Sequence, residues 1–223
     1  MTCSGDAPAP SKNLLAGRLH AGLSLGVFGS ELTFSSGTQS AYIERRAVSA
    51  AIDLQLGEAN TISLGGGAGL GGLLRFGDAR YVISPGWLFT AAYSRRLLDG
   101  QGAWPFLLLG VSLGGSGAST RAETPIAIAP AMPSTASLFA FDLRASLTVG
   151  KTLFRVMSPY ASARVFGGPV IWSTGQTTIT GTDQRHFQLA AGLMTALPRG
   201  FDLYVEGAPL GERAVTIGGG VRF

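Results

Sequence analysis

Charged side chains are scarce in this chain, and long hydrophobic runs are absent. Only 13% of the 223 residues are Asp, Glu, Lys or Arg, about half of the roughly 25% that is usual in soluble domains. The hydrophobic fraction is an ordinary 46%, and the mean hydropathy is +0.30. A membrane-spanning helix requires about 18 consecutive apolar residues, and the sequence contains no such run. The composition therefore argues against a helical membrane span and predicts that part of the surface faces something other than water.

Cysteine and histidine are also rare, which limits the chemistry of possible sites. Cys3 is the only cysteine, so an internal disulfide and a cysteine-cluster metal site are excluded. The two histidines, His20 and His186, have no carboxylate cluster at metal-ligand spacing. Nucleophilic catalysis needs a base beside a nucleophile, and no such arrangement surrounds either histidine. The sequence therefore predicts no catalytic residue, no metal and no cofactor.

Two features that could indicate nucleotide or nucleic-acid binding are better explained otherwise. The net charge is +4, but the 17 Lys and Arg residues are scattered without a basic run, which is typical of solvated or lumenal positions. The stretch ASLTVGKT (145–152) fits the loose pattern of a phosphate loop. Such a loop must open a helix, whereas this stretch continues a predicted strand. We expect no nucleic-acid partner.

Apolar residues alternate with small or polar ones in about ten segments of strand length. In 137–150, Phe139 and Leu143 share one face, and Asp142 and Arg144 share the other. Because lipid satisfies no backbone hydrogen bond, strands can cross a membrane only as a closed barrel. The pattern predicts an all-β fold, a transmembrane antiparallel up-and-down β-barrel of about ten strands in 17–223, after a periplasmic N-terminal segment in 1–16. The expected strands are 17–28, 47–57, 61–72, 83–96, 104–115, 137–150, 159–172, 186–197, 201–208 and 214–223.

The connectors and the aromatic residues predict how this barrel is oriented. Outer-membrane barrels have long extracellular loops, short periplasmic turns and a girdle of aromatic residues at each interface. The longer connectors here are 29–46, 73–82, 116–136 and 173–185, and they alternate with shorter ones. The aromatic residues at strand ends predict one girdle of Trp104, Tyr160, Phe201 and Phe223, and another of Phe28, Phe139, Trp172 and Phe187.

The last strand, AVTIGGGVRF, resembles the C-terminal signal that the assembly machinery of bacterial outer-membrane β-barrel proteins reads. Apolar residues alternate in it, and it ends in an aromatic residue, with Val215, Ile217, Val221 and Phe223 on one face. The resemblance implies an outer-membrane location and contacts with outer-membrane lipid and with that machinery. The first residues do not have the pattern of a secretory signal, so we expect the signal to have been removed.

Two classes of function are compatible with such a barrel. The first is a non-enzymatic barrel, either a narrow channel or an anchor whose extracellular loops bind envelope proteins or assemble a complex. The alternative is a barrel enzyme that acts on lipid or peptide at the extracellular rim, where only Asp183, Arg185 and His186 come together. A soluble lipocalin-like barrel is disfavoured, because such barrels place apolar residues inside and carry far more charge.

Four ionisable residues are predicted to face the lumen as a charge network: Asp142, Arg144, Arg164 and Glu206. If the connector 151–158 is centred near residue 154, Arg144 faces Arg164 across the two strands. If 173–185 is centred near 178 and 198–200 at 199, Glu206 lies level with Arg164, separated from it by Gly192 alone. Asp142 is a diagonal neighbour of the other arginine. We interpret the four residues as an ionic plug that closes the bore. The competing interpretation is that each charge is simply hydrated in a wet lumen.

Overall fold

The computed structural model describes residues 18–35, 40–123, 135–173 and 177–223. Within these ranges, no helix is long and apolar enough to cross a membrane. The predicted N-terminal segment 1–16 lies outside the described residues. One antiparallel sheet is formed by β1 (Leu19–Phe34), β2 (Ser40–Leu56), β3 (Asn60–Phe76), β4 (Ala79–Ile83), β5 (Gly86–Asp99), β6 (Phe106–Ala122), β7 (Thr135–Gly150), β8 (Met157–Gly167), β9 (Val170–Ser173), β10 (Thr178–Asp183), β11 (Phe187–Ala196), β12 (Phe201–Gly211) and β13 (Arg213–Arg222), with the short 3₁₀ helix η1 (Pro198–Gly200) between β11 and β12.

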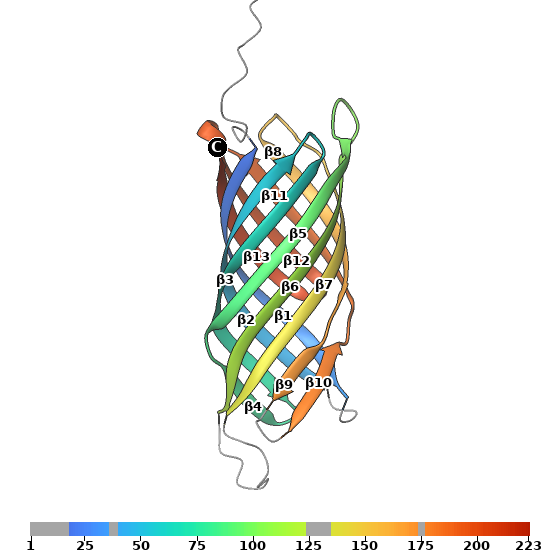
Figure 1. Cartoon of the computed structure of the whole chain (residues 1–223). Helices are drawn as coiled ribbons and strands as arrows, with labels where there is room; N and C mark the ends of the chain where they lie inside the picture. The colour runs from blue at the N-terminus through green and yellow to red at the C-terminus, as the bar shows by residue number, and fades with distance from the viewer. Residues whose placement is uncertain (1–17, 36–39, 124–134, 174–176) are drawn as a thin grey trace, which may run out of the picture.

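These strands close into an elongated, tilted barrel (Figure 1). Its wall has ten strand positions, which we call staves, and each is occupied by one strand or by two consecutive strands. Three staves are each made of two consecutive strands. The first is β4 with β5, which both pair with β3 and β6. The second is β8 with β9, which both pair with β7, and the third is β10 with β11. The pairing of β1 with β13 closes the ring, which confirms the predicted up-and-down barrel.

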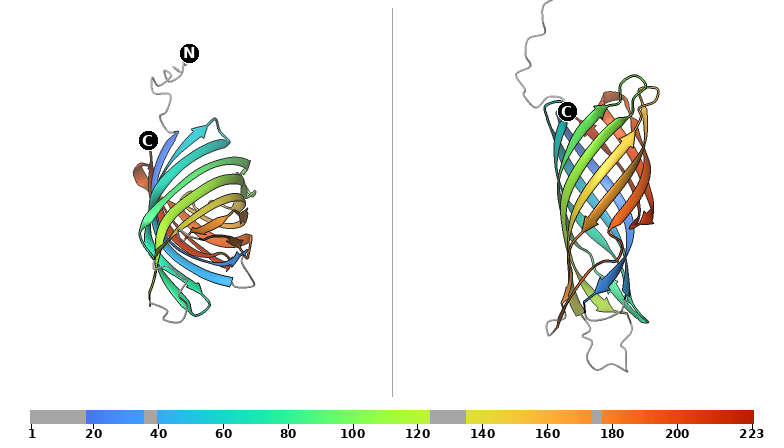
Figure 2. Two further views of the ribbon diagram at one scale, coloured as in Figure 1. Left: turned by 60° about the horizontal axis from the view of Figure 1, so that its bottom comes forward. Right: turned by 90° about the vertical axis from the view of Figure 1, so that its right-hand side faces the viewer.

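The barrel narrows toward one end because the β12–β13 hairpin is short. β1 pairs with β13 over residues 20–29 and then with β10 over residues 32–34. Gly211 turns the hairpin with a φ of 81°, where a Cβ atom would collide with the carbonyl oxygen of Phe187. Ten staves surround the end that holds the C-terminus, which we call the wide section. Beyond the hairpin, β1, β2, β3, β4, β6, β7, β9 and β10 form an eight-stranded narrow section (Figure 2).

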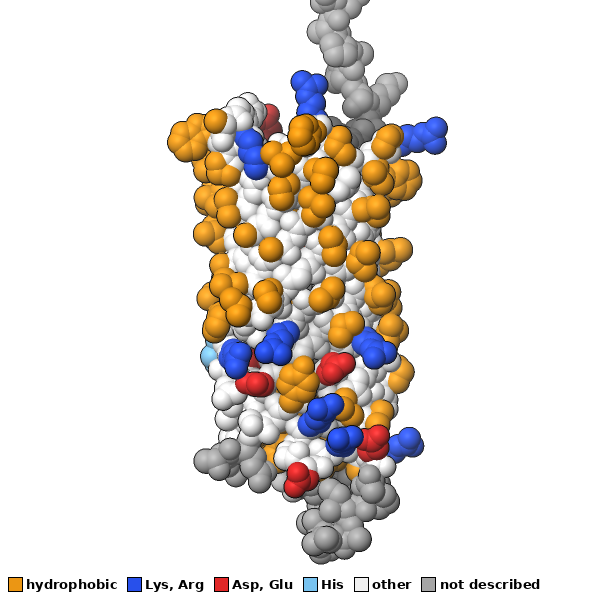
Figure 3. Space-filling view, turned by 180° about the vertical axis from the view of Figure 1, so that it is seen from behind, with side chains coloured by type: hydrophobic (Ala, Val, Ile, Leu, Met, Phe, Trp, Pro, Cys, Tyr) orange, Lys and Arg blue, Asp and Glu red, His pale blue; other side chains and the backbone are white. Residues whose placement is uncertain are grey.

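The two sections have opposite polarity. In the wide section the apolar side chains point outward, as with Leu23 (66% exposed) and Leu64 (62%), and the inward positions are mostly small or polar. In the narrow section Leu74, Ile83 and Trp172 point inward and are at most 4% exposed. Figure 3 shows apolar side chains over most of the barrel height and a cluster of charged ones near one end. The outward apolar surface of the wide section, which we call the apolar belt, is the part that faces lipid.

Most of the long connectors predicted at the narrow end are strand. β1 extends to Phe34 and β2 begins at Ser40, so little of the predicted connector 29–46 is a loop. The predicted connector 73–82 is strand on both sides of a turn at residues 77–78. Apolar and polar residues continue to alternate through these stretches, but the apolar ones face inward. The sequence pattern therefore differs from that of a lipid-facing strand. The prediction was therefore wrong about where these strands end.

Three of the eight predicted girdle residues face the interior of the barrel. Trp172 is 4% exposed, Phe28 lines an internal cavity, and the Tyr160 hydroxyl donates a hydrogen bond to Glu206. Their positions at strand ends did not reveal which face of the sheet they occupy. The other five are at least 40% exposed: Trp104, Phe139, Phe187, Phe201 and Phe223.

Candidate functional site

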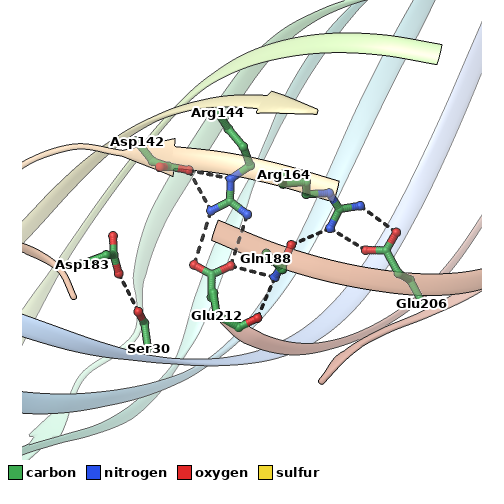
Figure 4. Close-up of polar contacts among 8 residues, drawn as sticks. All are labelled: Ser30, Asp142, Arg144, Arg164, Asp183, Gln188, Glu206 and Glu212. Atoms are coloured by element: carbon green, nitrogen blue, oxygen red, sulfur yellow. Dashed lines mark hydrogen bonds and ion pairs between the residues drawn. The ribbon is translucent and has the colours of Figure 1, made fainter. Parts of the chain in front are cut away.

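Charged side chains from several staves meet inside the barrel at the level where it narrows (Figure 4). Asp142 and Arg144 come from β7, Arg164 from β8 and Glu206 from β12. Successive side chains of a strand point to opposite faces. Because Leu143 is 59% exposed on the outer face, its neighbours Asp142 and Arg144 must face the lumen. The same parity turns Arg164 and Glu206 inward.

Arg164 and Glu206 form a bidentate ion pair. The two terminal guanidinium nitrogens donate to the two carboxylate oxygens of Glu206, each over 2.7 Å. Gln188 of β11 accepts a further hydrogen bond from Arg164 at 2.7 Å, and the Tyr160 hydroxyl donates to Glu206 at 3.1 Å. Both charged side chains are largely buried, with 21% and 13% exposure. Parallel charge-assisted hydrogen bonds of this kind are among the strongest in proteins.

Arg144 is held by two acids and an aromatic ring. Its Nε donates to Asp142 at 2.8 Å, and its two terminal nitrogens donate to the carboxylate of Glu212 at 3.2 and 3.4 Å. The guanidinium lies 4.5 Å from the ring centre of Phe166. Gln188 donates to the backbone and side-chain oxygens of Glu212 and so joins the two arginine clusters. The result is one continuous set of polar contacts over β7, β8, β11 and the β12–β13 hairpin, which we call the polar layer.

The predicted register of this layer is wrong, although the predicted residues lie close together. Arg164 is paired with Ser146 across β7 and β8, and Phe166 stands opposite Arg144. The turn is centred one residue later than expected, and this shifts the register by two residues. The two arginines therefore do not oppose each other. Gln188, and not the predicted Gly192, lies opposite Arg164 on β11. Glu206 is therefore not level with Arg164, which reaches it through its long side chain.

Glu212 and Gln188 belong to the polar layer, but sequence reasoning missed them. Glu212 lies in the turn of the β12–β13 hairpin, where the alternation of strand residues does not apply. Gln188 lies within the expected strand 186–197, but its partners Arg164 and Glu212 come from other segments, and alternation along one strand does not reveal them. Charge counting gave no signal for Glu212, because Asp142 and Glu206 already supply one acid for each of the two lumenal arginines.

The rim residues of the enzyme alternative do not converge on a common point. Asp183 faces the interior and accepts a hydrogen bond from Ser30 at 2.6 Å. Arg185 lies 3.5 Å from Glu31, with both side chains about half exposed, and His186 is exposed. Asp183 lies in β10, beyond the apolar belt, where burial raises the pKa of its carboxyl group and the Ser30 hydrogen bond opposes the rise.

A second polar cluster, also missed from the sequence, lies at the opposite end of the wide section. His20 of β1 contacts Asp53 of β2 at 2.8 Å through Nδ1 and Asp202 of β12 at 2.9 Å through Nε2. Strand β13 lies between His20 and Asp202, and its residue at this level is Gly220, where a Cβ atom would collide with the His20 ring. The glycine therefore permits a contact that joins both sides of the β1–β13 closure.

An internal cavity of about 220 Å³ separates the polar layer from the apolar interior of the narrow section. Its lining includes Arg144, Asp142 and Glu212 on one side and Leu138 on the other. Arg45 also lines it, 5% exposed, and donates to Ser116 at 3.0 Å. Two buried polar atoms at this level, Arg45 Nε and Asp142 Oδ1, have no hydrogen-bond partner among the described residues.

The residues of the predicted assembly signal lie on the closing strand. Val215, Ile217 and Phe223 are 58–61% exposed, and Val221 pairs with Ala21 and Phe201. The backbone N–H of Phe223 donates to the carbonyl oxygen of Leu19 at 2.9 Å. Their recognition by an assembly machinery remains a prediction.

Comparison with solved structures identifies the fold class. The structure is similar to the outer membrane protease OmpT from Escherichia coli, with a TM-score of 0.60 and 13% identity over 92% of this chain and 97% of that chain. It is also similar to the translocator domain of the autotransporter NalP from Neisseria meningitidis, with a TM-score of 0.52 and 14% identity over 96% and 90%. No family model matches the sequence, and no curated protein is similar to it. The chain therefore has the fold of a bacterial outer-membrane β-barrel.

Proposed function

We propose that this protein is a closed outer-membrane anchor, which holds the narrow section beyond the membrane as a platform for a partner in the cell envelope. The observation that carries the proposal is the filling of the bore at two consecutive levels. Of the two non-enzymatic roles that the sequence allows, an open narrow channel is disfavoured by this filling.

The first obstruction is the apolar interior of the narrow section. Eight strands enclose a space that side chains just fill. Phe34, Phe76 and Tyr81 pack around Trp172 with ring centres 4.9–6.5 Å from the indole. The indole nitrogen donates to Thr120 at 2.9 Å, so its one polar group is satisfied. This interior resembles the core of a soluble protein, and its described residues present no polar path for ions.

The second obstruction is the polar layer below it. Arg144 and Arg164 extend into the lumen from the paired strands β7 and β8, and each is held by a carboxylate of the β12–β13 hairpin. A mobile charge could move aside for a solute. A bidentate pair such as Arg164–Glu206 is held at both ends, so it supports a rigid closure.

The proposal is tested by single-channel recording of the refolded barrel in planar bilayers. We expect no steady conductance from the wild type. Combining Leu74→Ala and Trp172→Ala with Glu206→Ala removes side chains from both obstructions, and we expect that variant to conduct. Leu64→Ala, on the lipid-facing side of the same strand as Leu74, is the matched control and should stay closed. Steady ohmic conductance in the wild type would contradict the anchor proposal and favour the channel.

A labelling experiment tests the platform. The turn at residues 77–78 joins two strands at the tip of the narrow section, and Asp78 is exposed. Asp78→Cys in a Cys3→Ser background should react with a membrane-impermeant maleimide on intact cells. Glu58→Cys, in a turn at the opposite end, should react only after the outer membrane is permeabilised. The reverse labelling pattern would place the narrow section on the periplasmic side and would contradict the orientation that we expect.

A further inference from the structure

A groove on the outer surface lies where the apolar belt ends, on strands β2 and β3. Its volume is about 430 Å³, and it is lined by Glu44, Arg46, Leu70, Gly71, Gly72, Leu73 and Arg75. We infer that this groove binds a phosphorylated membrane lipid, with the phosphate between Arg46 and Arg75 and the acyl chains along the apolar belt. The inference does not depend on whether the bore is open or closed.

A β-bulge creates the groove. The register between β2 and β3 shifts at Arg46 and Ala47, so β3 contains an extra residue there. Gly71 has a φ of 104°, which a residue with a side chain rarely adopts. At Gly72 a Cβ atom would collide with the carbonyl oxygen of Glu44. Gly71 and Gly72 therefore contribute only backbone to the lining of the groove, which lets a ligand approach the strands closely at this point.

The arginines around the groove have no ion-pair partner in the part of the chain that the structure describes. Among the ion pairs of the described residues, none includes Arg46, Arg75 or Arg80. Arg75 and Arg80 are directly opposite each other on β3 and β4, and both side chains are exposed. Like charges in such a pair repel and destabilise the sheet. An anion placed between or beside them removes that repulsion, and a guanidinium fork matches the oxygens of a phosphate.

The acids at this end do not neutralise these arginines. Glu44 lines the groove, Asp78 lies in the turn after β3, and the backbone of Glu123 pairs with Arg80. No carboxylate oxygen of the three lies within 4.0 Å of the arginines around the groove. Glu44 instead suits a headgroup that carries hydrogen-bond donors beside its phosphate, such as an amine or sugar hydroxyls.

The position of the groove indicates a lipid rather than a soluble anion. Leu70 is 52% exposed at one edge of the groove, and Val48, 37% exposed, follows Arg46 on the same face of β2. These residues continue into the apolar belt. A phosphate bound at the arginines would therefore place the attached acyl chains against apolar side chains, whereas free phosphate would gain nothing from them.

Native mass spectrometry of the full chain, refolded in a mild detergent, tests the inference. The probes are phosphatidylethanolamine, diacylglycerol with the same acyl chains, and free phosphoethanolamine. We expect the wild type to retain phosphatidylethanolamine and not diacylglycerol. The double variant Arg46→Gln/Arg75→Gln should lower the retained fraction by about tenfold, because two charge-assisted hydrogen-bonding groups are lost.

Arg95→Gln is the matched control, because Arg95 is an exposed arginine at the other end of the β3–β5 pair. It should retain lipid like the wild type, and heat-dependent gel mobility verifies that each variant is folded. Equal retention by the double variant would overturn the inference, as would equal retention of diacylglycerol by the wild type. Full displacement of the lipid by phosphoethanolamine at the same concentration would show that the acyl chains contribute nothing, and it would overturn the lipid assignment.

Discussion

The wide and narrow sections share strands, but their apolar side chains point in opposite directions, outward in the wide section and inward in the narrow one. In β1, Leu23 points into the lipid, and nine residues later Leu32 points into the interior, 2% exposed. The strand does not change its geometry between them, since the alternation of faces is continuous. Only the surroundings change, from lipid outside a polar bore to water outside an apolar core. The comparison teaches that a single sheet can be a membrane barrel at one end and a water-soluble barrel at the other.

The largest effect is expected from emptying the interior of the narrow section. Trp172→Ala should lower the free energy of unfolding by about 3–5 kcal/mol, because it leaves a cavity and removes the hydrogen-bond donor to Thr120. Urea unfolding in lipid vesicles measures the change. Trp104→Ala is the control, because Trp104 is 73% exposed and should matter far less. Equal losses would mean that the narrow section has no core of its own.

The second prediction reverses polarity in the wide section. Leu64→Arg places a charge in the lipid and should cost about 2–4 kcal/mol if residue 64 lies near the bilayer midplane. Ser63→Arg changes the next residue, which faces the lumen opposite Asp53, and should cost less. The same unfolding assay compares the two variants. If Ser63→Arg proves the more harmful, the lumenal and lipid faces have been exchanged in our assignment.

The third prediction concerns the boundary between the sections. Glu206→Gln removes the charged partner of Arg164 and should cost about 1.5–3 kcal/mol, the usual contribution of a hydrogen bond to a charged group. Arg164→Met completes a double-mutant cycle with it. We expect the double variant to lose less than the sum of the single losses, since the second change removes a charge that is already unpaired. Strict additivity would show that the pair is not coupled.

The smallest effect is expected from Asp183, and it depends on pH. Burial raises the pKa of this carboxyl group in the folded barrel, so the protonated form favours folding. This contribution is full below the unfolded pKa and is lost as the pH rises through the raised, folded one. Asp183→Asn should therefore flatten the decline in stability above pH 3.8, the ordinary value for the group. Parallel pH profiles of the two proteins would contradict the prediction.

Sequence reasoning was most successful where one physical rule acted alone. Alternation in 137–150 placed Leu143 outside and Arg144 inside, because the period of a strand is two wherever it runs. It failed at Trp172, which was assigned to a lipid interface because aromatic residues favour interfaces. The environment of that residue depends on whether ten or eight staves surround it, and this number follows from the length of a hairpin far away in the sequence.

The charge network also combines features that alternation predicts with features that it does not. Parity alone turned Asp142, Arg144, Arg164 and Glu206 toward the lumen. It could not give the register, because one residue more or less in a turn moves a neighbouring strand by two positions. It also could not find Glu212, whose side chain enters the bore from a turn.

The sequence by itself determined the class of fold and the face of residues inside the predicted lipid-facing strands, because scarce charge and a period of two leave a closed barrel as the solution for a chain in lipid. The tertiary structure decided where that barrel narrows, which acid meets which arginine, and which apolar residues form a core. These depend on turn lengths and on the closure of β1 against both β13 and β10. They are relations between distant segments, and no local pattern of residues records them.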